Sequence, residues 1–195
     1  MIALTRQGVA TALLVVAALF VGSLVTARLP QPDALLDRPF EHHGALGAPV
    51  MLRTGTVSVT GLRSGTQASG YLDVAVTRAI WLVTDLEWTP ARNAAPLNSL
   101  EARIIAPDGR QFGGAAEVTP LCSRTQTGVT FVCSIAFEMD PAAVAGASLH
   151  VPAAGSIDDA DDVAVIDLGL DAERAATLTS ATGRVALAEA HAKEG

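Results

Sequence analysis

Several common marks of catalysis are missing from this chain of 195 residues. It holds no Gly-x-Ser-x-Gly nucleophile elbow, no His-Glu-x-x-His zinc helix and no Gly-rich phosphate loop that ends in lysine. We therefore expect no catalytic, cofactor-binding or metal-binding residues, and the protein is predicted not to be an enzyme. Scattered Ser, His and Asp residues leave catalysis open as an alternative, because triads are recognised by geometry and not by residue order.

Cysteine is also scarce, since the chain holds Cys122 and Cys133 and no other. They do not form a Cys-x-x-Cys redox motif, and neither lies near the N-terminal apolar run, where a lipid would be attached. Outside the cytoplasm such a pair predicts a structural disulfide. The net charge of −7 makes nucleic acid and anionic lipid surfaces poor partners.

What the chain does have is an uncharged apolar run over residues 8–27. As a helix this run is about 30 Å long, which is the thickness of a bilayer core and predicts one transmembrane anchor. The preceding residues 1–7 contain Arg6, so a short cytoplasmic N-terminus is expected. These features predict a single-pass protein of the cell membrane with an extracytoplasmic C-terminal domain.

Two further interpretations concern the same run. Val25-Thr26-Ala27 has the small residues that a signal peptidase accepts, so cleavage near Ala27 and release of a secreted domain is the alternative. The run exceeds the usual signal-peptide length of about 7 to 15 apolar residues, which favours the uncleaved anchor. Ala18, Gly22 and Thr26 recur on one helix face and form a possible helix-packing face.

Residues 28–49 contain four prolines and no periodic pattern, so we expect an extended linker. Glu41-His42-His43 offers side chains of the metal-binding type. His150 and His191 are far along the chain, and adjacent histidines need further ligands, so no metal site is expected there.

Residues 50–170 alternate between short apolar runs and turn signals, which predicts an all-β, immunoglobulin-like antiparallel β-sandwich. The expected strands lie at 56–63, 72–76, 80–88, 99–105, 110–112, 129–139, 147–151 and 163–168, with a loop at 64–70 and a Pro107-Asp108-Gly109 turn that forms a hairpin. Cys133 is expected to point into the core.

Three segments resemble a known family: 71–88, 100–112 with its Ala-Pro-Asp-Gly-Arg turn, and 129–151 with Phe-Glu-Met-Asp-Pro. They are similar to the telokin-like, immunoglobulin-like extracytoplasmic domains of membrane-anchored proteins from actinobacteria and other Gram-positive bacteria. Members of that group are mostly of unknown function and are taken as accessory or binding modules. The resemblance therefore implies a fold and a location, and it implies no catalytic residues.

Two segments near the C-terminus complete the prediction. Asp158, Asp159, Asp161 and Asp162 form an acidic loop whose spacing does not fit an EF-hand, so a solvated turn is favoured over a calcium site. Residues 171–195 have an N-cap candidate in Asp171 but a centre rich in Thr, which predicts a weakly helical or mobile tail.

The predicted function is that of a single-pass, membrane-anchored accessory or protein-interaction module whose partners are envelope or membrane proteins. A module that binds a small ligand or an ion of the envelope is the alternative.

Overall fold

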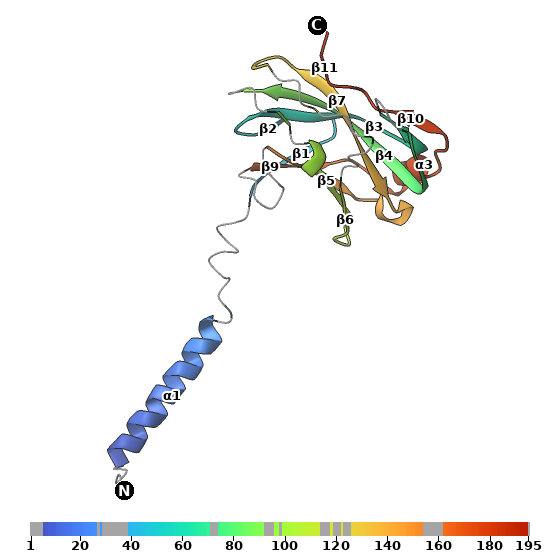
Figure 1. Ribbon diagram of the computed structural model, residues 1–195. Coiled ribbons are helices and arrows are strands. Elements are labelled where there is room, and N and C mark those ends of the chain that lie inside the picture. Colours follow the sequence, from blue (N-terminus) through green and yellow to red (C-terminus); the bar gives the residue numbers. More distant parts are fainter. Residues whose placement is uncertain are drawn as a thin grey trace. The chain divides into compact units, whose positions relative to one another are not determined.

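The computed structural model describes residues 6–26, 28, 39–70, 74–91, 96–97, 99–113, 118, 122, 126–153 and 162–194. The chain divides into two compact units, Met1–Arg38 and Pro39–Gly195. Figure 1 shows both, coloured along the sequence.

The first unit contains helix α1 (Arg6–Thr26). Large apolar residues follow one another along it, so they occupy every side of the helix, and those described, such as Leu14, Leu19 and Phe20, are exposed. No helix among the described residues combines the length and the apolarity needed to cross a membrane.

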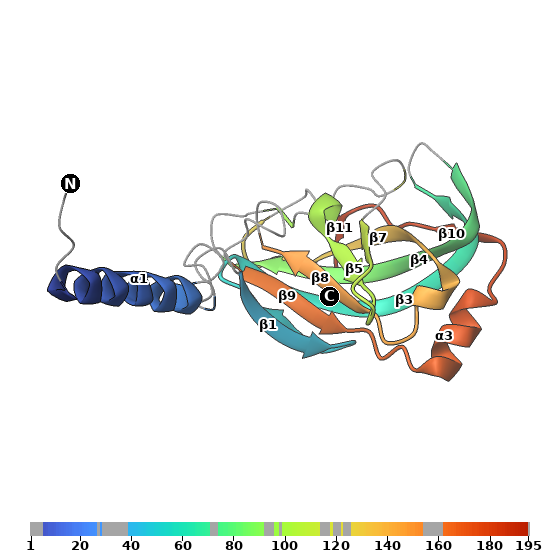
Figure 2. The same cartoon turned by 90° about the horizontal axis from the view of Figure 1, so that it is seen from below.

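The second unit is a β-sandwich of two sheets, which confirms the prediction of a mainly β fold (Figures 1 and 2). The first sheet consists, in spatial order, of β1 (Phe40–Ala45), β9 (Asp162–Asp167), β8 (Ser148–Pro152), β5 (Arg103–Ile105) and β6 (Gln111–Gly113). The second consists of β10 (Arg184–Ala186), β3 (Gly55–Ser69), β4 (Val74–Pro90), β7 (Phe131–Met139) and β11 (His191–Ala192), with β2 (Val50–Met51) beside β3.

The chain crosses twice between the sheets in a related way. It passes from β4 to β5 and from β7 to β8, while β4 pairs with β7 and β5 pairs with β8. Among the described strands, the pairing is antiparallel except at two places, where β1 runs parallel to β9 and β10 runs parallel to β3. Within residues 50–170, where the antiparallel sandwich was predicted, the described ladders are antiparallel, and each parallel ladder involves a strand outside that range, β1 or β10.

The core lies between the sheets and follows the alternation of the sequence. Leu82, Leu86 and Trp88 of β4 point inward, as do Ile135 and Phe137 of β7, and all are fully buried. Each such side chain stabilises the fold by about 1.5 to 3 kcal/mol relative to an exposed position. The Pro107-Asp108-Gly109 turn joins β5 to β6 as predicted, with Gly109 at a φ of 85°.

The predicted loop at 64–70 is wrong, because β3 continues to Ser69. Its polar and small residues pair with β4, so their backbone N–H and C=O groups form hydrogen bonds within the sheet, whereas those of a loop would bind water. Likewise Ser99–Glu101 is a turn of 3₁₀ helix, and the strand expected at 99–105 begins at Arg103.

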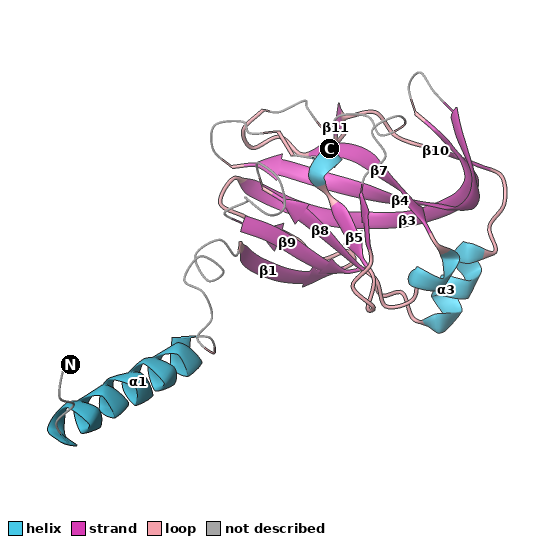
Figure 3. Cartoon of the chain, turned by 60° about the horizontal axis from the view of Figure 1, so that its bottom comes forward, coloured by secondary structure: helices cyan, strands magenta, loops and turns pink. Residues whose placement is uncertain are grey.

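Both ends assigned to the sandwich also differ from the prediction. Strand β1 lies inside the segment predicted as linker, and its parallel ladder with β9 makes it part of the first sheet. The predicted tail at 171–195 holds helix α3 (Ala172–Thr179), which Asp171 caps as predicted, and the two strands β10 and β11 (Figure 3). These C-terminal strands are ordered by pairing with β3 and β7, a long-range effect that local propensity does not express.

Candidate functional site

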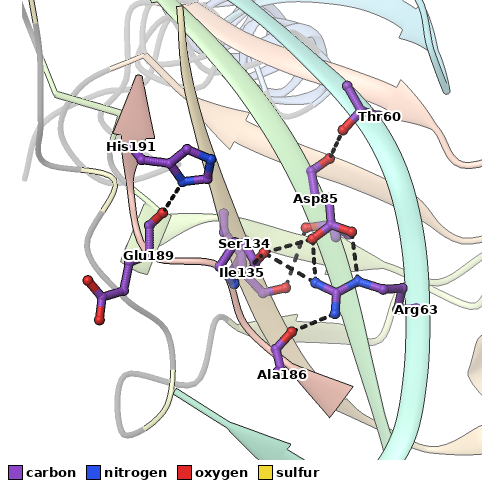
Figure 4. Close-up of polar contacts among 10 residues, drawn as sticks. Thr60, Arg63, Asp85, Ser134, Ile135, Ala186, Glu189 and His191 are labelled. Carbon is purple, nitrogen blue, oxygen red and sulfur yellow. Dashed lines mark hydrogen bonds and ion pairs between the residues drawn. The ribbon is translucent and has the colours of Figure 1, made fainter. Parts of the chain in front are cut away.

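A polar cluster lies on the outer face of the second sheet, and its central contact is an ion pair between Arg63 and Asp85 (Figure 4). Arg63 donates from Nε to Asp85 Oδ2 at 2.8 Å and from its NH2 group to Oδ1 at 2.6 Å. A β-bulge at Thr60 makes this possible, because the register shifts between Val59 and Gly61. The extra residue turns Arg63 from the core side to the outer side.

Ser134 joins this cluster from β7 (Figure 4). Its Oγ donates to Asp85 Oδ1 at 2.7 Å and accepts the N–H of Ala188 at 3.0 Å. Arg63 also donates to the carbonyl oxygen of Ala186 at 2.5 Å. The cluster therefore ties residues 183–194, which we call the C-terminal strap, to the face of the sheet.

The electrostatics of the cluster agree with a structural role. Burial acts to raise the pKa of Asp85, but the hydrogen bonds from Arg63 and Ser134 and the charge of Arg63 outweigh it and hold the pKa below its usual value. The same hydrogen bond raises the pKa of Arg63. Asp85 is thus kept ionised, and both of its carboxylate oxygens accept hydrogen bonds. A carboxylate with a lowered pKa is a weak proton acceptor near neutral pH, which does not suit a general base.

Beneath the strap lies a small apolar cluster that is separate from the main core. Val185 and Leu187 of the strap cover Trp81, Val83 and Ala136 of the sheet. At the far end, Lys193 Nζ contacts Glu87 Oε1 at 2.7 Å. The strap thereby buries the outer face of β4, although the alternation of apolar and polar residues in β4 predicts that this face is exposed to solvent.

The two cysteines are bonded to each other, which confirms the predicted disulfide. Cys133 is fully buried in β7 and belongs to the main core, as expected. Cys122 is also buried, and the bond fixes this residue to the inner side of the second sheet. The disulfide joins two buried residues of the core, and the structure describes no free cysteine.

The histidines near the start of the domain point to opposite faces of β1, because neighbouring strand residues alternate. His43 Nε2 lies 3.3 Å from Glu41 Oε2 on the outer face, whereas His42 Nε2 lies 3.7 Å from Asp162 Oδ2. Among the residues that the structure describes, no three His, Cys, Asp or Glu side chains are grouped to hold a metal ion.

The acidic loop is described only at its last residue, because Asp158, Asp159 and Asp161 lie outside the described residues. Asp162 is fully buried, so the prediction of a solvated turn was wrong for this residue. Its Oδ2 accepts the backbone N–H of Arg53 at 2.6 Å, and Arg53 Nε lies 3.3 Å from Oδ1. The Arg53 guanidinium lies 5.4 Å from the centre of the Phe40 ring.

The remaining two histidines lie far apart in the fold. His150 is half-buried on the outer face of the first sheet, opposite Arg103 in the ladder. Burial lowers its pKa, the negative charge of Glu41 acts to raise it and His43 acts to lower it further. His191 is exposed on the strap and its Nδ1 lies 2.8 Å from the carbonyl oxygen of Glu189 (Figure 4).

An exposed apolar surface was missed at the sequence level. The alternation of Leu72, Val74 and Val76 suggests a core face, but Val74 is 49% exposed and Val76 is 70% exposed. The reason is that β7 ends at Met139, opposite Ile80, so the β3–β4 pair continues beyond its neighbour. In Figure 2 this end of the pair lies next to β10 and apart from the first sheet.

The predicted helix-packing residues Ala18, Gly22 and Thr26 lie on α1 and are exposed. A Cβ added at Gly22 would meet no atom within 4 Å, and Thr26 Oγ1 donates back to the Gly22 carbonyl oxygen at 2.8 Å. A partner helix for this face stays a prediction.

Comparison with known proteins gives no family or relative for this chain. No protein-family model matches it, and neither the curated proteins nor the solved structures contain a match.

Proposed function

We propose that this protein is a non-catalytic, extracytoplasmic interaction module that is attached to the cell membrane by its N-terminal segment. Its partners are proteins of the envelope or of the membrane. The attachment part of the proposal rests on the uncharged run of residues 8–27, and the interaction part rests on the surface of the domain.

The observation that carries the interaction role is the exposed pair Val74 and Val76. Both lie on one face of β4, at its end, and both expose about half or more of their side chain. Exposed apolar residues that lie together mark binding surfaces more often than isolated ones do.

The internal polar contacts support a non-catalytic role. Asp162, which is fully buried, and Asp85, which is half-buried, are each paired with an arginine. A carboxylate held by an arginine is stabilised in its charged form and serves structure well, whereas it is a poor acid or base near neutral pH.

The disulfide supports a location outside the cytoplasm, because structural disulfides persist in oxidising compartments. The crossovers from β4 to β5 and from β7 to β8, with β4 on β7 and β5 on β8, support an immunoglobulin-like arrangement. These two features agree with the resemblance to telokin-like extracytoplasmic domains.

The proposal is tested by purifying the tagged full-length chain from its native membrane in mild detergent. Intact mass decides whether the chain still contains residues 8–27 or begins near Arg28. A retained N-terminal segment with a stoichiometric partner protein supports the proposal, and a soluble chain that begins near Arg28 overturns the attachment.

A further inference from the structure

We infer that the end of the β3–β4 pair binds an extended segment of another protein, which adds as a strand beside Val74–Ala79 and carries apolar and acidic side chains. This inference rests on the proposed interaction role and names the surface and the chemistry of the partner.

The end of β4 has an edge that no described strand covers. Between Ile80 and Trp88, β4 has β3 on one side and β7 on the other. Over Val74–Ala79 no described strand pairs on the β7 side, although Val74–Val76 still pairs with β3. This segment is about 20 Å long, which is the usual length of a strand, and an unpaired edge presents backbone groups that an extended peptide can bind.

Beside that edge lies a surface that we call the hairpin-end face, which consists of Gln67, Ser69, Val74, Val76 and Arg78. The ladder places these residues on one face, because Gln67 is opposite Val76 and Ser69 is opposite Val74. The register of β3 shifts a second time between Gly65 and Gln67, so Ala68 faces the strap. Val74 and Val76 lie on the opposite face, which the strap does not cover.

The charges beside the valines are positive. Arg78 lies on the same face as the valines and is exposed, and Arg184 of β10 is opposite Gln67 and is exposed as well. Neither arginine forms an ion pair with a described residue, in contrast to Arg53, Arg63, Arg103 and Arg110. Two positive charges that no described acidic side chain pairs, in a chain of net charge −7, favour an acidic partner segment at this place.

The opposite face of β4 is also consistent with an acidic partner on the hairpin-end face. Thr77 points to the opposite face, where its hydroxyl donates to Glu138 and accepts the N–H of Ala79 at 2.9 Å. The negative charge of Glu138 therefore lies away from the valines and Arg78. An added strand would meet apolar and positive groups on one face and small or polar groups on the other.

The experiment uses the full-length protein in detergent micelles and a fluorescein-labelled nine-residue peptide, TETVTVTET. The peptide reads the same in both directions, so it presents valine and glutamate on one face whether it adds parallel or antiparallel. TKTVTVTKT is the matched peptide of opposite charge. Fluorescence anisotropy gives Kd for each, and hydrogen exchange of the β4 amides locates the bound peptide.

We expect the glutamate peptide to bind at least about tenfold more tightly than the lysine peptide, and Arg78→Glu to reverse this order. Val76→Asp should weaken both peptides, whereas Met51→Asp, which changes an exposed residue of β2, should change neither. Exchange should slow at Val74–Ala79.

Equal affinity for the two peptides, no binding up to about 1 mM or an unchanged order in Arg78→Glu overturns the inference. Protection at another edge overturns it too. None of these results affects the proposed interaction role, which is decided separately by the proteins that purify with the full-length chain.

Discussion

Arg63 and Asp85 face each other across β3 and β4 because one extra residue, Thr60, is inserted in β3. Without this bulge, Arg63 would continue the inward series of Val57 and Val59 and would enter the apolar core. The bulge thus creates an ion pair that receives Ser134 and, through it, the C-terminal strap.

Replacing Asp85 by asparagine should lower the free energy of unfolding by about 1 to 2 kcal/mol at neutral pH, because Arg63 and Ser134 lose a charged acceptor in a partly exposed site. The depressed pKa of Asp85 means that its contribution exists above about pH 4 and is lost as the pH falls further. Urea unfolding of both proteins should therefore show a difference that shrinks below pH 4. Glu189→Gln, an exposed acid on the strap, is the control, and an equal difference at pH 7 and pH 3 would contradict this account.

His150 should make the domain less stable as the pH falls through about 6.5. Burial lowers its folded-state pKa, so the unfolded chain binds the proton more readily and acid favours unfolding. Glu41 and His43 on β1, Ser148 on β8 and Arg103 on β5 are the polar groups around it. In melts between pH 5 and 8, His150→Gln should remove this part of the pH dependence, whereas the exposed His191→Gln should keep it.

Deletion of residues 182–195 should expose the outer face of the second sheet. Trp81 is 4% exposed beneath Val185 and Leu187, so its fluorescence should shift to longer wavelength when the strap is absent. The single change Leu187→Ala should cost about 2 kcal/mol and leave the fold intact. Unchanged emission in the truncated protein would show that the strap does not cover Trp81.

The disulfide should stabilise the domain by about 2 to 3 kcal/mol, since the bond closes a short loop in the unfolded chain. Adding a reductant should lower the Tm of the native protein and leave the Cys122→Ala/Cys133→Ala double variant unchanged. A native protein whose Tm does not respond to reductant, although its thiols become reactive, would contradict this prediction.

Several features of the domain could be predicted because they depend on local pattern. Leu86 and Trp88 alternate with Asp85 and Glu87, and this alternation identified the inner and outer faces of β4 correctly. The disulfide followed from the small number of cysteines, and the cap of α3 followed from Asp171.

Other features depend on contacts between distant segments. The bulge at Thr60 has no local signature, so the position of Arg63 could not be predicted from the alternation in β3. The strap is ordered by Ser134, Ser69 and Thr130, each of which lies more than fifty residues before the strap residue that it contacts. Val76 is exposed where the β3–β4 pair extends beyond the end of β7. The end of β7 is set by residues about sixty positions later in the chain, so the sequence around Val76 does not predict this exposure.

The most direct measurement is the comparison of proteins that purify from native membranes with the full-length chain and with its Val76→Asp and Met51→Asp variants. We predict a stoichiometric envelope or membrane protein with the native chain and with Met51→Asp, and its loss with Val76→Asp. A native chain that retains residues 8–27 and purifies alone, or a partner that is held equally by all three, would contradict the proposal that the exposed end of the β3–β4 pair makes this domain an interaction module.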